Sequence, residues 1–115
     1  MYEEMENLIS LLDLALKEYK TRGKEYAKAY KEYRVLVAKK LLELKANGMP
    51  VTIAYDIARG DEVVANAKER EIITETLYKS CQEAINTYKL QIKVLQEQIN
   101  KEWAASKEWC YVLEE

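Results

Sequence analysis

The chain has 115 residues, a formal net charge of −2 at pH 7, three glycines and one proline. This length suits one domain, and so few loop-forming residues predict a structure that is nearly all helix. The sequence contains no histidine, which removes the commonest general base, metal ligand and pH switch of proteins. We therefore expect a protein that is not an enzyme, with no catalytic residue, no metal site and no cofactor.

The first predicted element is a long helix over about residues 3–46. Its apolar residues recur at spacings of three and four, which is typical of a helix with one buried face. This stripe consists of Leu8, Leu12, Ala15, Tyr19, Tyr26, Tyr30, Tyr33, Val37, Leu41 and Leu44. Arg22 interrupts the stripe, and Gly23 within it costs about 1 kcal/mol relative to Ala and indicates a bend or a close packing contact. We expect the helix to end at Asn47-Gly48, where glycine provides a left-handed cap and Pro50 prevents the helix from resuming.

The charge is unevenly distributed along this helix. Residues 1–16 carry four acidic side chains and no cation, whereas residues 17–45 carry ten Lys or Arg and four Glu. Five of these cations form a lysine stripe on one side of the helix: Lys17, Lys20, Lys24, Lys28 and Lys31.

At about 100° per residue, the tyrosines of the apolar stripe lie roughly opposite the lysine stripe. A surface that stacks bases needs aromatic rings and cations on the same side. We therefore predict that the tyrosines are core residues and that the lysines are solvated. Contact of the lysine stripe with phosphates stays open as an alternative, because five aligned cations would neutralise several phosphates without reading sequence.

A short helix follows over about residues 52–59. Thr52 is a good N-cap residue, and Gly60 is expected to end the helix. Asp61 then caps the last helix.

The last predicted helix covers about residues 61–105 and is followed by a short C-terminal tail. Its apolar seam alternates steps of three and four without a slip, which is coiled-coil spacing. The seam consists of Val64, Ala67, Glu71, Thr74, Tyr78, Cys81, Ile85, Tyr88, Ile92, Leu95 and Ile99. Glu71 is unusual at a seam position, and pairing with Arg22 across the two helices or with a partner helix would reduce the cost of burying its charge.

Two long helices of matching length and a short connector predict an all-α fold in one domain, residues 1–115. The specific expectation is an antiparallel two-helix coiled-coil hairpin with a short connecting helix. Apolar residues outside the seams need a cover, which favours a homodimer in the form of a four-helix bundle, with a different protein partner as the next choice. Candidate partner-binding residues are Leu36, Ile72, Trp103 and Trp109.

The cellular location is predicted from two features of the sequence. The apolar run from Leu8 to Leu12 is too short for a signal peptide or a membrane span. The two cysteines, Cys81 and Cys110, show no short-range partner spacing and fit a reducing compartment. We expect a cytoplasmic protein with no membrane partner.

The stretch from Lys45 to Trp103 resembles a family of small, uncharacterised helical proteins encoded by phages and prophages of low-GC Gram-positive bacteria (Firmicutes). The matching pattern consists of Thr52, Ala54, Asp56, Ala58, Arg59, Gly60 and Asp61, followed by Glu102 and Trp103. Genes of this family tend to lie among early genes near recombination functions. The resemblance implies an accessory role in the host cytoplasm and no catalytic residue.

Two classes of function follow. In the first, the protein binds another protein of phage or host origin and modulates or inhibits a DNA-processing or defence protein. In the second, it is a nucleic-acid-binding accessory of recombination or replication that uses the lysine stripe. Surplus apolar residues and the absence of catalytic groups favour the first class.

Overall fold

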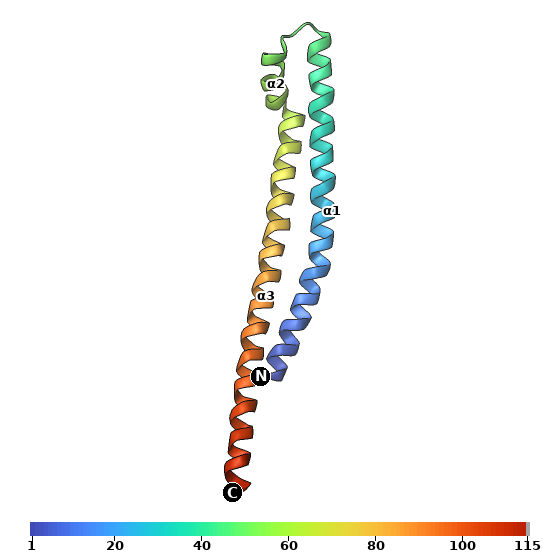
Figure 1. Ribbon diagram of the computed structural model, residues 1–115. Helices are drawn as coiled ribbons and strands as arrows, with labels where there is room; N and C mark the ends of the chain where they lie inside the picture. The colour runs from blue at the N-terminus through green and yellow to red at the C-terminus, as the bar shows by residue number, and fades with distance from the viewer. Residues whose placement is uncertain (115) are drawn as a thin grey trace. The chain divides into compact units, whose positions relative to one another are not determined.

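The computed structural model describes the backbone of residues 1–114 and the side chains of residues 1–106. Over this range the chain is all-α, with α1 at Tyr2–Ala46, α2 at Val51–Gly60 and α3 at Glu62–Glu114 (Figure 1). The class and the number of predicted helices are confirmed. The predicted end of the last helix is wrong, because α3 continues through the segment after residue 105 that was expected to be a tail.

The chain divides into two compact parts. The first part contains residues 1–18 and 81–115, and the second contains residues 19–80. Each part therefore combines a segment of α1 with a segment of α3, and the second part also holds α2.

In the first part, α1 contacts α3 through small and apolar residues. The Cys81 thiol donates a hydrogen bond to the carbonyl oxygen of Ala15 at 3.3 Å. Ala15 and Ile85 are both buried, and Leu8 shares a groove with Leu95. Low numbers on α1 thus meet high numbers on α3, so the two segments are antiparallel.

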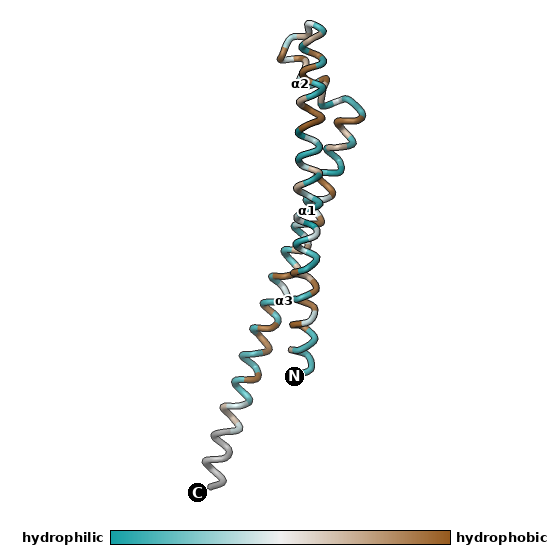
Figure 2. Tube along the Cα trace, turned by 90° about the vertical axis from the view of Figure 1, so that its right-hand side faces the viewer, coloured by the Kyte–Doolittle hydropathy of each residue, from teal (hydrophilic) through white to brown (hydrophobic). Residues whose placement is uncertain are grey.

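In the second part, α1 and α3 are also antiparallel. Tyr19 contacts Tyr78, Glu32 contacts Arg70, and Lys40 contacts Asp61. Buried alanines and valines lie between these contacts: Ala29 and Val37 on α1, Val64 and Ala67 on α3. Figure 2 shows that apolar residues recur along both helices between polar ones, as the helical period requires.

The end of α1 has the predicted glycine cap. Gly48 has φ of 82°, in the left-handed region. Its N–H donates to the carbonyl of Lys45 at 3.0 Å, and the N–H of Met49 donates to the carbonyl of Leu44 at 3.1 Å. These two bonds form a Schellman motif, which satisfies carbonyl groups at the end of the helix and turns the chain toward α2.

The small helix α2 packs on the end of α1 through two alanines. Ala54 and Ala58 are fully buried and form a cluster with Leu44, against which Leu41 and Met49 pack. Both alanines lie on one face of α2 because they are four residues apart, and their short side chains allow α2 to approach closely.

The predicted cap at Thr52 is wrong. The helix begins at Val51 with Pro50 as N-cap, and no side chain caps it. The carbonyl of Pro50 accepts hydrogen bonds from the N–H groups of Ile53 and Ala54 at 3.2 and 2.9 Å. Proline suits this position because its ring already restricts φ to the observed −60°. Thr52 therefore lies inside the helix and is exposed.

At the junction of α2 and α3, the predicted cap of α3 at Asp61 is observed, whereas the C-cap of α2 is Asp61 and not the predicted Gly60. Gly60 is the last residue of α2, and Asp61 precedes α3. A carboxylate oxygen of Asp61 accepts a hydrogen bond from the N–H of Val64 at 3.4 Å, and Lys40 lies 3.6 Å from the other oxygen. Asp61 thus caps α3 and also links it to α1.

The predicted α3 seam agrees with the observed burial, since every one of its positions is buried or half-buried. The α1 stripe agrees except at Tyr30, which is 44 % exposed. Ala29, only 3 % exposed, is a core residue that the stripe missed. Over the described residues, no helix combines the length and the apolar character that a membrane crossing requires.

Candidate functional site

The strongest candidate site is a cavity of about 480 Å³ in the second part of the chain. All three helices contribute to it. Its lining consists of Tyr30, Tyr33, Arg34, Val37, Ala38 and Leu41 from α1, Tyr55 and Arg59 from α2, and Lys68 and Glu71 from α3. We call this cavity the basic pocket. Its volume lies within the range of about 300–1,000 Å³ that is typical of pockets for small organic ligands.

Three cation–tyrosine pairs surround the basic pocket. The Arg59 guanidinium lies 4.4 Å from the centroid of the Tyr55 ring, and its Nη2 donates a hydrogen bond to the Tyr55 hydroxyl at 3.3 Å. On α1, Arg34 lies 5.6 Å from the Tyr30 ring centroid, and its Nη1 donates to the Tyr30 hydroxyl at 3.1 Å. On both α1 and α2, a tyrosine therefore orients the arginine that follows it by one helical turn.

The third pair joins two helices. The Lys68 ammonium of α3 lies 4.8 Å from the centroid of the Tyr33 ring of α1. The same ammonium donates to the Glu71 carboxylate at 3.4 Å. A ring quadrupole attracts a cation without neutralising its charge, so these contacts position the cations and leave them positive.

Glu71 is the only buried charged residue among the described side chains, at 5 % exposure. Its observed ion pair is with Lys68, and the predicted pairing with Arg22 is wrong. The physical reason is the register of the two helices: Glu71 lies beside Tyr30 and Tyr33 in the basic pocket, whereas Arg22 contacts Glu25 on its own helix at 3.4 Å.

The pocket has an excess of positive charge. Three cations and one carboxylate line it, so the lining side chains carry a net charge of +2. Neither Arg34 nor Arg59 makes an ion pair with any carboxylate that the structure describes. The hydrogen bond with Tyr55 raises the pKa of Arg59 further above its usual value, so this guanidinium stays charged. Such a pocket attracts anions.

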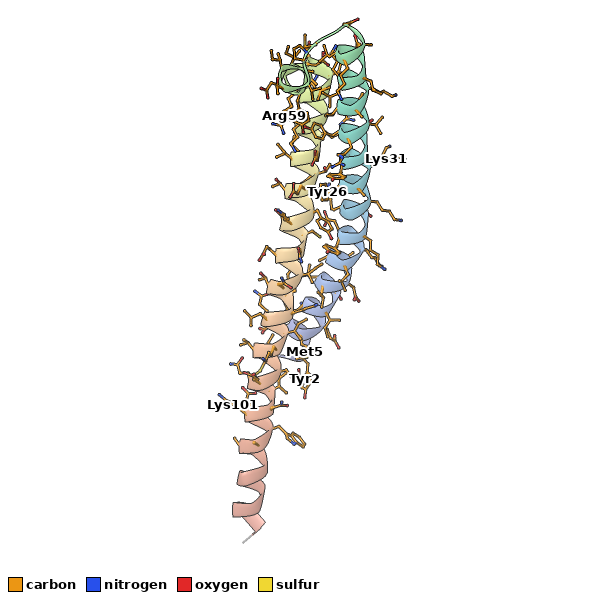
Figure 3. All side chains as sticks on the ribbon, turned by 45° about the horizontal axis from the view of Figure 1, so that its top comes forward. Tyr2, Met5, Tyr26, Lys31, Arg59 and Lys101 are labelled. Atoms are coloured by element: carbon orange, nitrogen blue, oxygen red, sulfur yellow. The ribbon has the colours of Figure 1, made fainter. Side chains whose placement is uncertain are left out.

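The lysines of the predicted phosphate track are exposed: Lys17, Lys20, Lys24, Lys28 and Lys31. Figure 3 shows Tyr26 between α1 and α3 and Lys31 on the side of α1 that faces away from α3. Tyr19, Tyr26 and Tyr33 are half-buried, as expected of core rings. Tyr30 differs, because its ring lies at the basic pocket beside Arg34.

The candidate partner-binding residues belong to different parts of the chain. Ile72, 51 % exposed, lies in the second part of the chain, and Trp103, 66 % exposed, lies in the first. Leu36 is half-buried. Trp109 lies outside the described side chains.

A second cavity lies in the first part of the chain. It has a volume of about 560 Å³ and is lined by Leu8, Leu90, Val94 and Leu95, with Glu4, Asn7 and Gln91 at polar positions. We call it the apolar groove. Leu90 and Val94 are 63 % and 55 % exposed, so α1 leaves much of this face of α3 uncovered.

The described residues contain no group of three or more Cys, Asp or Glu side chains placed to hold a metal ion. Comparison with protein-family models, with curated proteins and with solved structures finds no match to this chain.

The sequence patterns described above do not predict the basic pocket, although the sequence contains one signal for it. Tyr30 and Arg34 are four residues apart, and so are Tyr55 and Arg59. This repeated spacing places each arginine beside a tyrosine on one helix face. It carries no information on the contact between α1 and α2, which is what creates the pocket.

Proposed function

We propose that the protein is a protein-binding module that first assembles with a second copy of itself. In this proposal, α1 and α3 form an antiparallel coiled-coil hairpin, and two hairpins form a four-helix bundle. The single observation that supports it best is the amount of apolar surface that the chain leaves exposed.

The exposed surface area is large for the mass of the chain. The accessible surface is 9061 Å², whereas a folded monomer of 13.5 kDa exposes about 6,500 Å². The difference of about 2,500 Å² exceeds what each chain of a standard protein–protein interface contributes, which is about 800 Å². A second copy therefore has ample surface to cover.

The exposed side chains have the chemistry that such an interface needs. Large apolar residues that are at least half exposed occur in both parts of the chain: Tyr2, Leu14, Leu42, Val51, Ile53, Val63, Ile72, Ile73, Leu90, Val94 and Trp103. Burying a Leu or Ile side chain contributes about 1.5–3 kcal/mol. The net charge of −2 is too small for repulsion between two copies to oppose association.

The apolar groove is the proposed centre of the interface. Its lining is mainly leucine and valine, and Leu90 and Val94 lie one turn apart on α3. A helix of the second copy would place apolar side chains between them, in the ridges-into-grooves manner of helical bundles.

The role of the assembled bundle follows from the resemblance of the sequence to phage and prophage proteins. We propose an accessory protein of the host cytoplasm that modulates or inhibits a DNA-processing or defence protein of phage or host. Affinity purification from infected cells with the dimeric protein as bait would identify that partner.

Self-association is tested with a double variant of the groove, Leu90→Glu and Val94→Glu. The added charges would be buried in the interface, so the dissociation constant of the dimer should rise by a factor of at least about a hundred. Gln96→Glu is the control, because it adds a negative charge at an exposed position of the same helix. Light scattering should show a monomer for the groove variant and a dimer for the control. A dimer in both would place the interface elsewhere.

A second candidate function is nucleic-acid binding through the lysine stripe, which the exposure of all five lysines favours. Phosphate contacts would make the affinity for DNA fall steeply between low and moderate salt. Exchange of Lys20, Lys24 and Lys28 for Glu should then abolish binding of labelled DNA. No binding of DNA at low salt would exclude this function.

A further inference from the structure

The basic pocket has two features that together restrict its ligand. Its lining side chains carry a net charge of +2, and its volume of about 480 Å³ exceeds what a simple inorganic ion would fill. A ligand that matches both features is an organic molecule with a doubly charged anionic group. A phosphate monoester fits, because it carries about −1.5 to −2 charges at pH 7.

The two arginines are suited to hold a phosphate. The guanidinium group presents its N–H donors in a planar fork that matches phosphate oxygens. Tyr30 and Tyr55 orient the guanidiniums of Arg34 and Arg59 before any ligand arrives. This preorganisation reduces the side-chain entropy that binding would otherwise cost.

The remaining lining of the pocket suits a flat ring. Val37, Ala38 and Leu41 form an apolar wall on α1, and the rings of Tyr30 and Tyr55 are 44 % and 40 % exposed. The Arg59 guanidinium lies over the Tyr55 ring at 4.4 Å and covers one face of that ring, so a base would stack on the outer face of the guanidinium or on the uncovered face of the ring. Nucleobases stack on tyrosine rings and on guanidinium planes of this kind.

We propose that the basic pocket binds a nucleotide, with Arg34 and Arg59 on the phosphate and the base against the tyrosine rings and the apolar wall. Lys68 adds a further cation to the lining of the pocket and is positioned there by Tyr33 and Glu71. The nucleotide is either free or part of a single strand, because both present the same phosphate and base. This site is distinct from the lysine stripe and from the apolar groove.

The test is calorimetric titration of the full chain with adenosine 5′-monophosphate, adenosine and inorganic phosphate. The nucleotide should bind at least about tenfold more tightly than either fragment, because only the nucleotide engages both the arginines and the rings. A short oligothymidylate in the same assay decides the source of the ligand. Tighter binding of the oligomer that Arg59→Gln weakens assigns the pocket to single strands, and weaker binding of the oligomer assigns it to free nucleotides.

The variants Arg34→Gln and Arg59→Gln should each weaken nucleotide binding by about tenfold or more, since each removes a charged donor to phosphate. Arg70→Gln is the matched control, because it removes the same charge from an exposed arginine outside the pocket that pairs with Glu32. It should change the affinity by less than about twofold, in line with the small effects of surface charges.

Three results would overturn the proposal: no binding of the nucleotide, equal binding of nucleotide and phosphate, or equal losses in Arg59→Gln and Arg70→Gln. The groove variant with Leu90→Glu and Val94→Glu separates this test from that of self-association. Its substitutions lie in the first part of the chain, so it should bind nucleotide like the unaltered protein.

Discussion

The rings of Tyr19 on α1 and Tyr78 on α3 are stacked, with centroids 4.7 Å apart and an interplanar angle of 22°. Their hydroxyl groups form a hydrogen bond of 2.6 Å. Tyr26, seven residues after Tyr19, contacts the same ring of Tyr78 at 5.9 Å. Gly23 lies between the two α1 tyrosines, so Tyr78 enters a gap that the missing side chain provides. This arrangement is that of a knob in a hole between two packed helices.

Gly23→Ala should fail to stabilise the protein despite the better helix propensity of alanine. A Cβ at position 23 would lie 3.1 Å from Cε2 of Tyr78, whose ring Tyr19 and Tyr26 hold in place. We expect a loss of about 1 kcal/mol in the free energy of unfolding from this crowding. Gly60→Ala is the control, because nothing lies within 4 Å of its Cβ and its φ is not positive. It should gain up to about 1 kcal/mol. Equal stabilisation by both changes would contradict the close contact.

Tyr78→Phe should lower the free energy of unfolding by about 1 kcal/mol, because it removes the hydrogen bond to Tyr19 and keeps the stacked ring. Tyr88→Phe is the control, since Tyr88 is a half-buried seam residue of α3 whose hydroxyl bonds to no described side chain. Chemical denaturation followed by circular dichroism measures both. A loss no larger than that of the control would mean that the hydroxyl pair contributes nothing to stability.

The sequence predicts this packing in part, because burial along a helix follows from its period. The seam of α3 from Val64 to Ile99 is a strict alternation of three and four, and its observed burial agrees. Gly23 predicts either a bend or a close packing contact, and the structure shows the contact. Its partner Tyr78 follows only from the register of two helices, which the spacing within one helix does not determine.

The incorrect predictions arise because the sequence does not determine how the helices pack on one another. Tyr30 satisfies the period of the α1 stripe, yet α3 does not cover it, and its ring lies beside Arg34 at the basic pocket. The expected pairing of Glu71 with Arg22 does not occur, because the register of the helices places Glu71 at the basic pocket, where its ion pair is with Lys68, three residues earlier on the same helix. The pocket itself depends on where α2 packs, which rests on the fit of two alanines to the end of α1.

The observed helix caps predict different effects for substitutions at Asp61 and Thr52. Asp61→Ala should cost about 1 kcal/mol, because Asp61 accepts the N–H of Val64 and contacts Lys40. Thr52→Ala should change the free energy of unfolding by less than about 0.5 kcal/mol, since no side chain caps α2 and Thr52 is exposed. Thermal unfolding of the two variants checks this order. A larger loss of unfolding free energy for Thr52→Ala than for Asp61→Ala would show that Thr52 does cap α2, as the sequence predicts.

Ile85→Asp should be the most damaging change in the first part of the chain. Ile85 is 6 % exposed, and a carboxylate there would be buried without a partner, at a cost of more than about 3 kcal/mol. Asn86→Asp places the same charge at the next, exposed position and should leave the helicity and the melting temperature nearly unchanged. If Ile85→Asp had the melting temperature of the unaltered protein, position 85 would not be buried between α1 and α3.

The mass of the purified protein in solution shows whether two copies of the chain associate. Multi-angle light scattering during gel filtration, at several protein concentrations, should give twice the chain mass of 13.5 kDa. A mass of 13.5 kDa at every concentration would mean that the chain is a monomer and that the apolar side chains at the groove and on α2 stay exposed to water.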